Sequence, residues 1–180
     1  DISFFAKPGQ TVGIIGGTGS GKSTLVNLVP NFYSATKGQV LIDGVNADEY
    51  DRAALLSAVS VVPQKAVLFE GTIRSNLLMG NPNASEAELF AALETAQAAE
   101  IVRTKPNGID EPVLRGGSNF SGGQKQRLSI ARALVHGGRI LILDDSASAL
   151  DFATDAKLRA AIRKLSPAPT TFIVSQRAAS

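Results

Sequence analysis

A short stretch near the start of the chain combines glycines with a lysine and several hydroxyl side chains: Gly16, Gly17, Thr18, Gly19, Ser20, Gly21, Lys22, Ser23 and Thr24. Its spacing, a glycine, four further residues and then Gly-Lys-Ser, is that of a phosphate-binding loop. The glycines let the backbone curl until successive N–H groups point at phosphate oxygens. Lys22 can then reach the β- and γ-phosphates, and the Ser23 hydroxyl can ligate Mg²⁺. The stretch predicts a nucleoside triphosphate site, against the alternative of a glycine-rich turn that binds nothing.

Two adjacent carboxylates, Asp144 and Asp145, follow the apolar run at residues 140–143. An unbroken apolar run of this length predicts a strand covered on both faces. Open α/β sheets place their ligands at the carboxyl ends of such strands. The first acid of such a pair can hold Mg²⁺, directly or through water, and the second can orient an attacking water. The alternative is a pair of solvated acids in a turn.

A third stretch of chemical interest is Ser121-Gly122-Gly123-Gln124. Ser121 and Gln124 have the spacing of a capping box, which by itself is structural. The two glycines are harder to explain, because glycine costs about 1 kcal/mol relative to alanine in a helix interior. Bare N–H groups at a helix start form a second anion site. Since one domain rarely needs two phosphate sites, the stretch suggests a nucleotide shared between two copies of the fold.

The flanks of these stretches predict the elements that position them. Residues 11–15 form a strand before the phosphate loop, and residues 25–29 form a helix closed by Pro30. Further strands are predicted at 38–44, 59–62, 140–143 and 171–175, and helices at 53–56 and at 121 to about 136. Another helix is predicted around 155–165, with Asp155 and Arg159 as an i,i+4 pair. From Gln64 to about Gly117 the pattern is helical, without a clear strand. Alternating strands and helices predict an α/β fold with a mostly parallel sheet, here with a helical insertion.

Several side chains receive a structural interpretation. Ser85 and Glu88 form a capping box for a helix whose apolar stripe is predicted as core: Leu89, Ala92, Leu93 and Ala96. Phe4 and Phe5 are also interpreted as core. His136, the only histidine, lies in the last turn of its predicted helix. A favourable cation at a helix end, or a plain surface residue, explains it better than a catalytic role.

Length and composition narrow the classes further. A chain of 180 residues suits one domain with a substantial core, and 44% hydrophobic with 19% charged residues is ordinary for a soluble globular protein. The net charge of +2 is too small to indicate nucleic acid, and the absence of cysteine excludes disulfides and thiolate metal sites. No apolar run approaches membrane-spanning length. Both ends look truncated, since only five residues follow the strand at 171–175.

The order of the motifs resembles the nucleotide-binding domain of an ATP-binding cassette (ABC) transporter. The chain shows a Walker A loop at 16–24, Gln64 after a strand, Ser-Gly-Gly-Gln at 121–124, a Walker B run ending at Asp144, and Ser-Ala-Leu-Asp at 148–151. The resemblance implies a P-loop NTPase (RecA-like) fold with a core at 1–64 and 138–180 and a helical subdomain at about 65–137. It also implies a head-to-tail dimer that binds two ATP molecules, each between one Walker A loop and the other Ser-Gly-Gly-Gln.

The resemblance also implies roles for single residues. Gln64 is the Q-loop glutamine, which reaches Mg²⁺ or water, and Asp144 is the Walker B acid, a Mg²⁺ ligand with Ser23. Asp151 is the D-loop aspartate. Residues 67–77 resemble exporters in particular, in which the segment after Gln64 receives the coupling helices of the transmembrane domain. The implied partners are that domain, in the same chain or separate, and a second nucleotide-binding domain, at the cytoplasmic face of the cell membrane. No nucleic acid is expected.

Three positions depart from the family pattern. Asp145 replaces a catalytic glutamate, Gln176 replaces the switch histidine, and Arg115 replaces a glutamate before the signature. Asp145 and Gln176 fall on the same composite site. In this respect the chain resembles the degenerate half of a heterodimeric multidrug exporter, which implies a non-identical partner domain. Three alternatives stay open: a fully active site, a non-hydrolysing regulatory module, and a related ATPase that acts on nucleic acid or the ribosome. The family's adenine-stacking aromatic is expected upstream of the chain.

Overall fold

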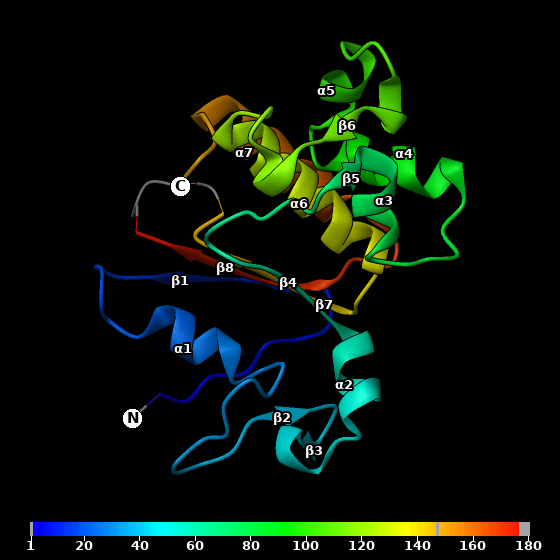
Figure 1. Ribbon diagram of the computed structural model, residues 1–180. Coiled ribbons are helices and arrows are strands. Elements are labelled where there is room, and N and C mark those ends of the chain that lie inside the picture. Colours follow the sequence, from blue (N-terminus) through cyan, green and yellow to red (C-terminus); the bar gives the residue numbers. More distant parts are fainter. Residues whose placement is uncertain (1, 147, 177–180) are drawn as a thin grey trace.

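The computed structural model describes residues 2–146 and 148–176, and a four-stranded sheet runs through its centre (Figure 1). Its strands are β1 (Thr11–Ile15), β8 (Thr170–Ser175), β7 (Ile140–Asp144) and β4 (Val59–Val62), in that order across the sheet. Every neighbouring pair is parallel. The predicted α/β class and parallel sheet are confirmed, and β4 has the predicted bounds.

Helices cover both faces of this sheet (Figure 1). One face carries α1 (Lys22–Asn27), α2 (Arg52–Ala58) and the hairpin of β2 (Leu41–Ile42) and β3 (Val45–Asn46). The other face carries α3 (Ile73–Leu78), α4 (Glu86–Thr95), α5 (Ala99–Arg103), α6 (Gly122–His136) and α7 (Phe152–Arg163). Short 3₁₀ turns lie at Ala47–Glu49, Gly108–Asp110 and Arg115–Gly117. Helices thus cover both faces of the sheet, and the carboxyl ends of its four parallel strands lie together along one side, the carboxyl edge.

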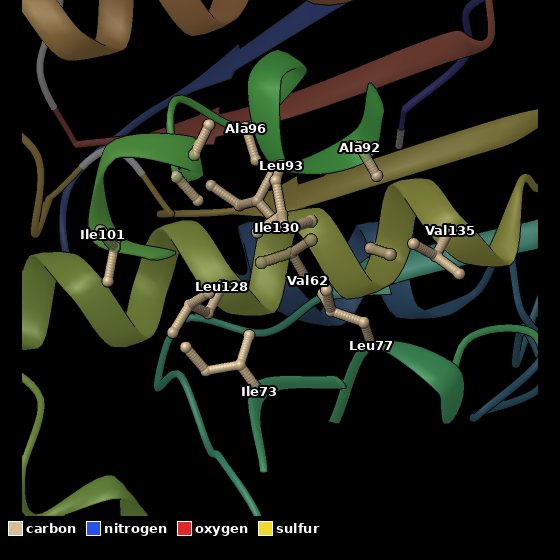
Figure 2. Packing of buried hydrophobic residues seen from close by; sticks show 14 of the residues in the cluster. Val62, Ile73, Leu77, Ala92, Leu93, Ala96, Ile101, Leu128, Ile130 and Val135 are labelled. Atoms are coloured by element: carbon tan, nitrogen blue, oxygen red, sulfur yellow. The ribbon is translucent and has the colours of Figure 1, made fainter. Parts of the chain in front are cut away.

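Two hydrophobic cores fill the layers on either side of the sheet. Alternate strand residues point to opposite layers, so that Leu141 and Leu143 pack toward α6, whereas Ile142 packs toward α1. Figure 2 shows the larger core, in which α6 contributes Leu128, Ile130 and Val135 between the sheet and the surrounding helices. The predicted stripe on α4 lies in this core, which confirms it: Leu89, Ala92, Leu93 and Ala96.

The ends of the long helices agree with the capping signals in the sequence. Ser85 and Glu88 form a capping box at the start of α4, and Ser121 and Gln124 form one at the start of α6. Gly137 ends α6 in the left-handed conformation, with φ 73°, which glycine adopts without steric strain. The helix after the phosphate loop, α1, ends at Asn27 rather than at Val29, because i→i+3 hydrogen bonds from Leu28 and Val29 tighten its end into a turn.

Four predictions about single elements need correction. The 64–117 region contains a two-residue antiparallel pair, β5 (Gly71–Thr72) with β6 (Pro112–Val113), which is too short to show an alternating pattern. The strand predicted at 38–44 is only two residues long, Leu41–Ile42, while the predicted Asp43-Gly44 turn at its end is confirmed and leads into the second strand of a hairpin. The strand at the end of the chain starts one residue earlier, at Thr170. The helix predicted around 155–165 contains the predicted pair of Asp155 and Arg159, 2.9 Å apart, but begins at Phe152, because Asp151 caps it there.

The interpretation of Phe4 and Phe5 as core residues is wrong. Phe4 is 54% exposed and Phe5 is 78% exposed, because no element covers this side of the first residues. The Phe4 ring keeps one edge-on aromatic contact, with its centroid 6.1 Å from that of Phe172. These side chains therefore contribute little to the buried core.

His136 is not a plain surface residue either. Its Nε2 atom lies 3.0 Å from the Leu56 carbonyl oxygen, and its Nδ1 atom lies 3.2 Å from the Gly80 carbonyl oxygen. The half-buried ring thereby joins the end of α2 to the turn after α3. Within residues 2–146 and 148–176, no helix has the length and apolar character needed to cross a membrane.

Candidate functional site

Four of the predicted site segments meet at the carboxyl edge of the sheet, because each follows the carboxyl end of a different parallel strand. The phosphate loop follows β1 directly, and Gln176 follows β8 directly. Asp144 ends β7 and Asp145 comes next, while Gln64 lies two residues after β4. This edge is where open α/β sheets bind their ligands. Segments up to about 160 positions apart in sequence thus converge on one site.

The phosphate loop has the backbone geometry that its glycines predict. Gly19 and Gly21 have φ values of 78° and 86°, in the left-handed region that strains other side chains. The Lys22 ammonium lies over the loop, 2.6 Å from the Gly17 carbonyl oxygen and 3.2 Å from Ser20 Oγ. Its charge is therefore held within the loop that would surround the phosphates. Thr24, in the first turn of α1, is exposed.

Ser23 and Asp144 provide oxygen atoms suited to Mg²⁺. The Ser23 hydroxyl donates a hydrogen bond of 2.9 Å to Asp144 Oδ1, and Asp144 is only 7% exposed. Hydroxyl and carboxylate oxygens are ligands that Mg²⁺ accepts, together with waters and phosphate oxygens. The described part of the chain has no group of three or more His, Cys, Asp or Glu that could hold a metal. The pair therefore fits an ion that is completed by a bound nucleotide.

Asp145 lies at the centre of a hydrogen-bonded network. Its Oδ2 atom accepts one hydrogen bond from Gln64 Nε2 and one from Gln176 Nε2, both 3.1 Å long. The Thr18 hydroxyl donates to Gln176 Oε1, also at 3.1 Å. The network thus connects the phosphate loop with the segments that follow β4, β7 and β8. Sequence reasoning placed Thr18 in the loop but gave no role to its side chain.

The backbone at Asp145 is held in an uncommon conformation. Its φ of 46° lies in the left-handed region, which Asp tolerates better than most side chains. The Asp145 N–H donates to the Val174 carbonyl oxygen at 3.1 Å, and the Ser148 hydroxyl donates to the Asp145 carbonyl oxygen at 2.7 Å. These contacts fix the Asp145 backbone, while Gln64 and Gln176 hold its carboxylate. The contact from Ser148 was also missed, since no sequence pattern signals a carbonyl partner.

The Ser-Gly-Gly-Gln stretch lies apart from this network. Gln124 N donates to Ser121 Oγ and Ser121 N donates to Gln124 Oε1, so that each side chain accepts a hydrogen bond from the other residue's backbone. A Cβ atom on Gly123 would lie 3.0 Å from the Ala149 carbonyl oxygen, so a glycine permits this close approach. The stretch starts α6, which covers the face of the sheet opposite to α1 (Figure 1). No hydrogen bond among the described residues joins it to the phosphate loop.

Asp151 serves as the N-cap of α7. Its carboxylate accepts hydrogen bonds from Thr154 Oγ1 at 2.7 Å and from Thr154 N at 2.9 Å. These bonds, the side-chain bond first, hold the pKa of Asp151 below the usual value of an aspartate. The residue is exposed, and it touches neither the phosphate loop nor Asp145 by any hydrogen bond seen in residues 2–146 and 148–176.

A groove with a cavity of about 260 Å³ opens between α6, the end of α2 and the turn after α3. Its apolar wall includes Phe32, Phe69 and Met79, each about half exposed. The Arg132 guanidinium stacks over the Phe69 ring at 5.4 Å and donates to the Val67 carbonyl oxygen. Burial lowers the pKa of this guanidinium from its usual value. The groove therefore offers an apolar surface beside a partly desolvated cation.

Comparison with known proteins places these features in a family. The family described as ABC transporter matches residues 1–148. An uncharacterized ABC transporter ATP-binding protein of Mycobacterium tuberculosis is 47% identical over 98% of this chain and 31% of its own length. A beta-(1-->2)glucan export ATP-binding/permease protein of Bartonella bacilliformis is 45% identical, and a putative multidrug export ATP-binding/permease protein of Staphylococcus aureus is 42% identical, each over 98% of this chain.

A solved structure agrees with these relatives. The structure of a bacterial Atm1-family ABC exporter with ATP bound has a TM-score of 0.93 and 37% identity, and the match covers 99% of this chain and 31% of that chain. The present chain thus spans about a third of the length of the proteins it matches. On its sequence, its fold and the arrangement of its phosphate loop and paired acids, the chain belongs to the ABC transporter family, in which it matches the nucleotide-binding domain.

Proposed function

We propose that the chain binds and hydrolyses ATP with Mg²⁺ in an ABC exporter, and that it dimerises head-to-tail around ATP to power transport. The observation that carries this proposal is the network that joins the phosphate loop, Gln64, Asp145 and Gln176 at one sheet edge. Relatives named as export ATP-binding/permease proteins support the exporter assignment.

Each side chain of the edge has a proposed task. Backbone N–H groups at 16–24 and the Lys22 ammonium bind the phosphates, and Ser23 with Asp144 holds Mg²⁺. When bound, Mg²⁺ neutralises charge on the β- and γ-phosphate oxygens. Gln64 holds Mg²⁺ or a water from the side of β4, and Asp145 orients the attacking water. Gln176 donates a hydrogen bond toward the γ-phosphate.

The Ser-Gly-Gly-Gln stretch and Asp151 are proposed to serve the ATP molecule of a second nucleotide-binding domain. The capping box leaves the Gly122 and Gly123 N–H groups at the start of a 15-residue helix, where an anion is favoured. Their separation from the phosphate loop of the same chain supports a composite site. The core at 1–64 and 138–180 would then bind one nucleotide, while the helical subdomain at about 65–137 completes the other.

We also propose that the chain's own catalytic site turns ATP over slowly. Asp145 is one methylene shorter than glutamate, and its Oδ2 atom is already engaged by two amide groups. A misplacement of about 1 Å can lower a rate about a hundredfold. Gln176 is neutral and cannot supply the positive charge of an imidazolium. A non-identical partner domain with a complete site would carry most of the hydrolysis.

The groove is the proposed contact for the transmembrane domain, in the same polypeptide or in a separate one. Phe69 and Met79 place exposed apolar surface there, within or next to the 67–77 segment that follows Gln64. Single exposed apolar side chains are ordinary, but a lined groove indicates a partner. This contact would hold the chain at the cytoplasmic face of the cell membrane.

The test measures ATP hydrolysis by the chain alone, by the chain mixed with its candidate partner domain, and by the Asp145→Glu, Gln176→His double variant. We expect little turnover from the unaltered chain alone, and at least a tenfold gain in the double variant (about 1.4 kcal/mol). Lys22→Ala is the control, because it must abolish turnover at this chain's own site, both in the chain alone and in the double variant, while the partner's complete site stays active in the mixture. Brisk hydrolysis by the unaltered chain alone would refute the slow site and favour a homodimeric transporter. Failure to bind ATP would refute the whole proposal.

A further inference from the structure

The Thr18 side chain makes a contact that the phosphate-binding role of its loop does not require. Its hydroxyl donates to Gln176 Oε1 at 3.1 Å, and Gln176 Nε2 in turn donates to Asp145 Oδ2 at 3.1 Å. Phosphate binding by such a loop uses backbone N–H groups and the lysine, and so leaves the residue-18 side chain unassigned. The contact links β1 and β8, whose ends are hydrogen-bonded neighbours in the sheet.

The two ends of the Gln176 amide are not chemically equivalent at this position. The amide carries an acceptor oxygen on one side and a donor nitrogen on the other, and an ionised carboxylate only accepts. The nitrogen must therefore face Asp145, and the oxygen must face away. Asp145 sets this orientation, because the reverse orientation would bring the amide oxygen against the carboxylate, and the Thr18 hydroxyl holds the amide in place by donating to its oxygen. Gln176 itself is exposed, so without such a partner its amide can turn toward water.

We propose that Thr18 is a positioning residue for hydrolysis, whose hydroxyl fixes the Gln176 amide with its nitrogen toward Asp145. The inference rests on the proposed roles of Gln176 and Asp145. A histidine ring at position 176 would be rigid, whereas glutamine has three rotatable side-chain bonds and needs an external partner. Thr18 supplies that partner from the loop that holds the phosphates, so that nucleotide and amide are positioned by one segment.

The first test reads the hydrogen bond itself by NMR on the chain, whose mass is 18.7 kDa. The Gln176 side-chain NH₂ signals are assigned by their absence in Gln176→Leu. In Thr18→Val, which keeps the shape but lacks the hydroxyl, we expect proton exchange of these signals to accelerate about twofold to tenfold. Thr18→Ser, which keeps the hydroxyl, is the matched control and should retain the protection. Equal exchange in all three forms would overturn the inference.

The second test measures ATP turnover at this chain's own site, with the chain mixed with a partner domain whose own phosphate-binding loop has been inactivated. Thr18→Val should lower kcat about twofold to tenfold, and Thr18→Ser should restore it. Adding Gln176→Leu to Thr18→Val should lower kcat no further than Gln176→Leu alone, because both substitutions remove the same Thr18–Gln176 hydrogen bond. If the fold-changes of the two single variants multiplied in the double variant, the inference would be overturned. Binding of a fluorescent ATP analogue by the unaltered chain is measured beside these assays. If the unaltered chain did not bind the analogue, the proposed function would be refuted, and the NMR result would still decide the orientation of Gln176.

Discussion

Among the glycines of the described residues, Gly80 lies closest to the backbone of another element. The substitution Gly80→Ala tests this close packing. The residue follows α3, and its N–H donates to the Leu77 carbonyl oxygen at 2.9 Å. A Cβ atom at this position would lie 2.4 Å from the Arg132 carbonyl oxygen and 2.9 Å from the His136 backbone nitrogen. Both atoms belong to the backbone of α6, so neither can rotate away as a side-chain tip would.

The expected cost follows from these distances. An ordinary contact needs about 3.4 Å or more, so the turn and α6 must separate by up to about 1 Å. Overpacking of a tight core costs about 1–3 kcal/mol, and contacts with backbone put Gly80→Ala near the upper end. For a chain of this size 1 kcal/mol shifts Tm by about 2–4 °C. We therefore expect Tm to fall by about 6–12 °C.

Calorimetry and urea unfolding are suitable assays, with Gly13→Ala as the matched control. Gly13 lies in β1 with open space where a Cβ atom would lie, so its substitution should be neutral or stabilising by up to about 1 kcal/mol. ATP affinity should remain unchanged in Gly80→Ala, because Gly80 is remote from the carboxyl edge of the sheet. A Gly80→Ala variant within about 0.5 kcal/mol of the unaltered chain would refute the close packing of this turn against α6.

Two further predictions concern the metal and the acid response. Ser23→Ala should raise the Mg²⁺ concentration needed for ATP binding at least about tenfold, whereas Ser23→Thr should preserve it. Titration of Mg²⁺ in the presence of a fluorescent nucleotide measures this concentration. Equal concentrations for Ser23→Ala and the unaltered chain would argue against a Mg²⁺ ligand at position 23. Hydrogen bonds from Ser85 hold the pKa of Glu88 below its usual value, so this group stabilises the fold above the ordinary glutamate pKa and loses that contribution as pH falls through its lowered pKa. Ser85→Ala should therefore reduce stability at neutral pH more than in acid below the lowered pKa of Glu88, as urea midpoints under both conditions would report.

The elements that sequence reasoning placed well are those whose signals are local. The strand at 59–62 is a short apolar run stopped by Pro63, and its bounds were predicted correctly. The long helix α6 was also predicted correctly, because Ser121 caps its start and Gly137 ends it. These signals act within a few residues of the boundary that they define. Tertiary contacts have little influence on them.

Features that depend on distant neighbours could not be predicted. The β5–β6 pair exists because residues 71–72 and 112–113 meet in space, and neither segment is long enough to show a pattern. The exposure of Phe5 depends on what covers the start of the chain. At the site, the rule that ligands bind at carboxyl strand ends predicts which segments meet. It does not predict which atoms meet, as with Thr18 and Gln176.

The helix α6 has a mechanical consequence that neither of its ends shows alone. It begins at the Ser-Gly-Gly-Gln stretch, and its last two turns place Arg132 and His136 in the wall of the groove. Its 15 residues span about 22 Å without an interior glycine or proline after the first turn. Such a helix moves as a rigid body, since it contains no residue at which it would bend. A displacement of the helix at the groove is therefore passed to its first turn, and that turn is the surface proposed to close on a second nucleotide.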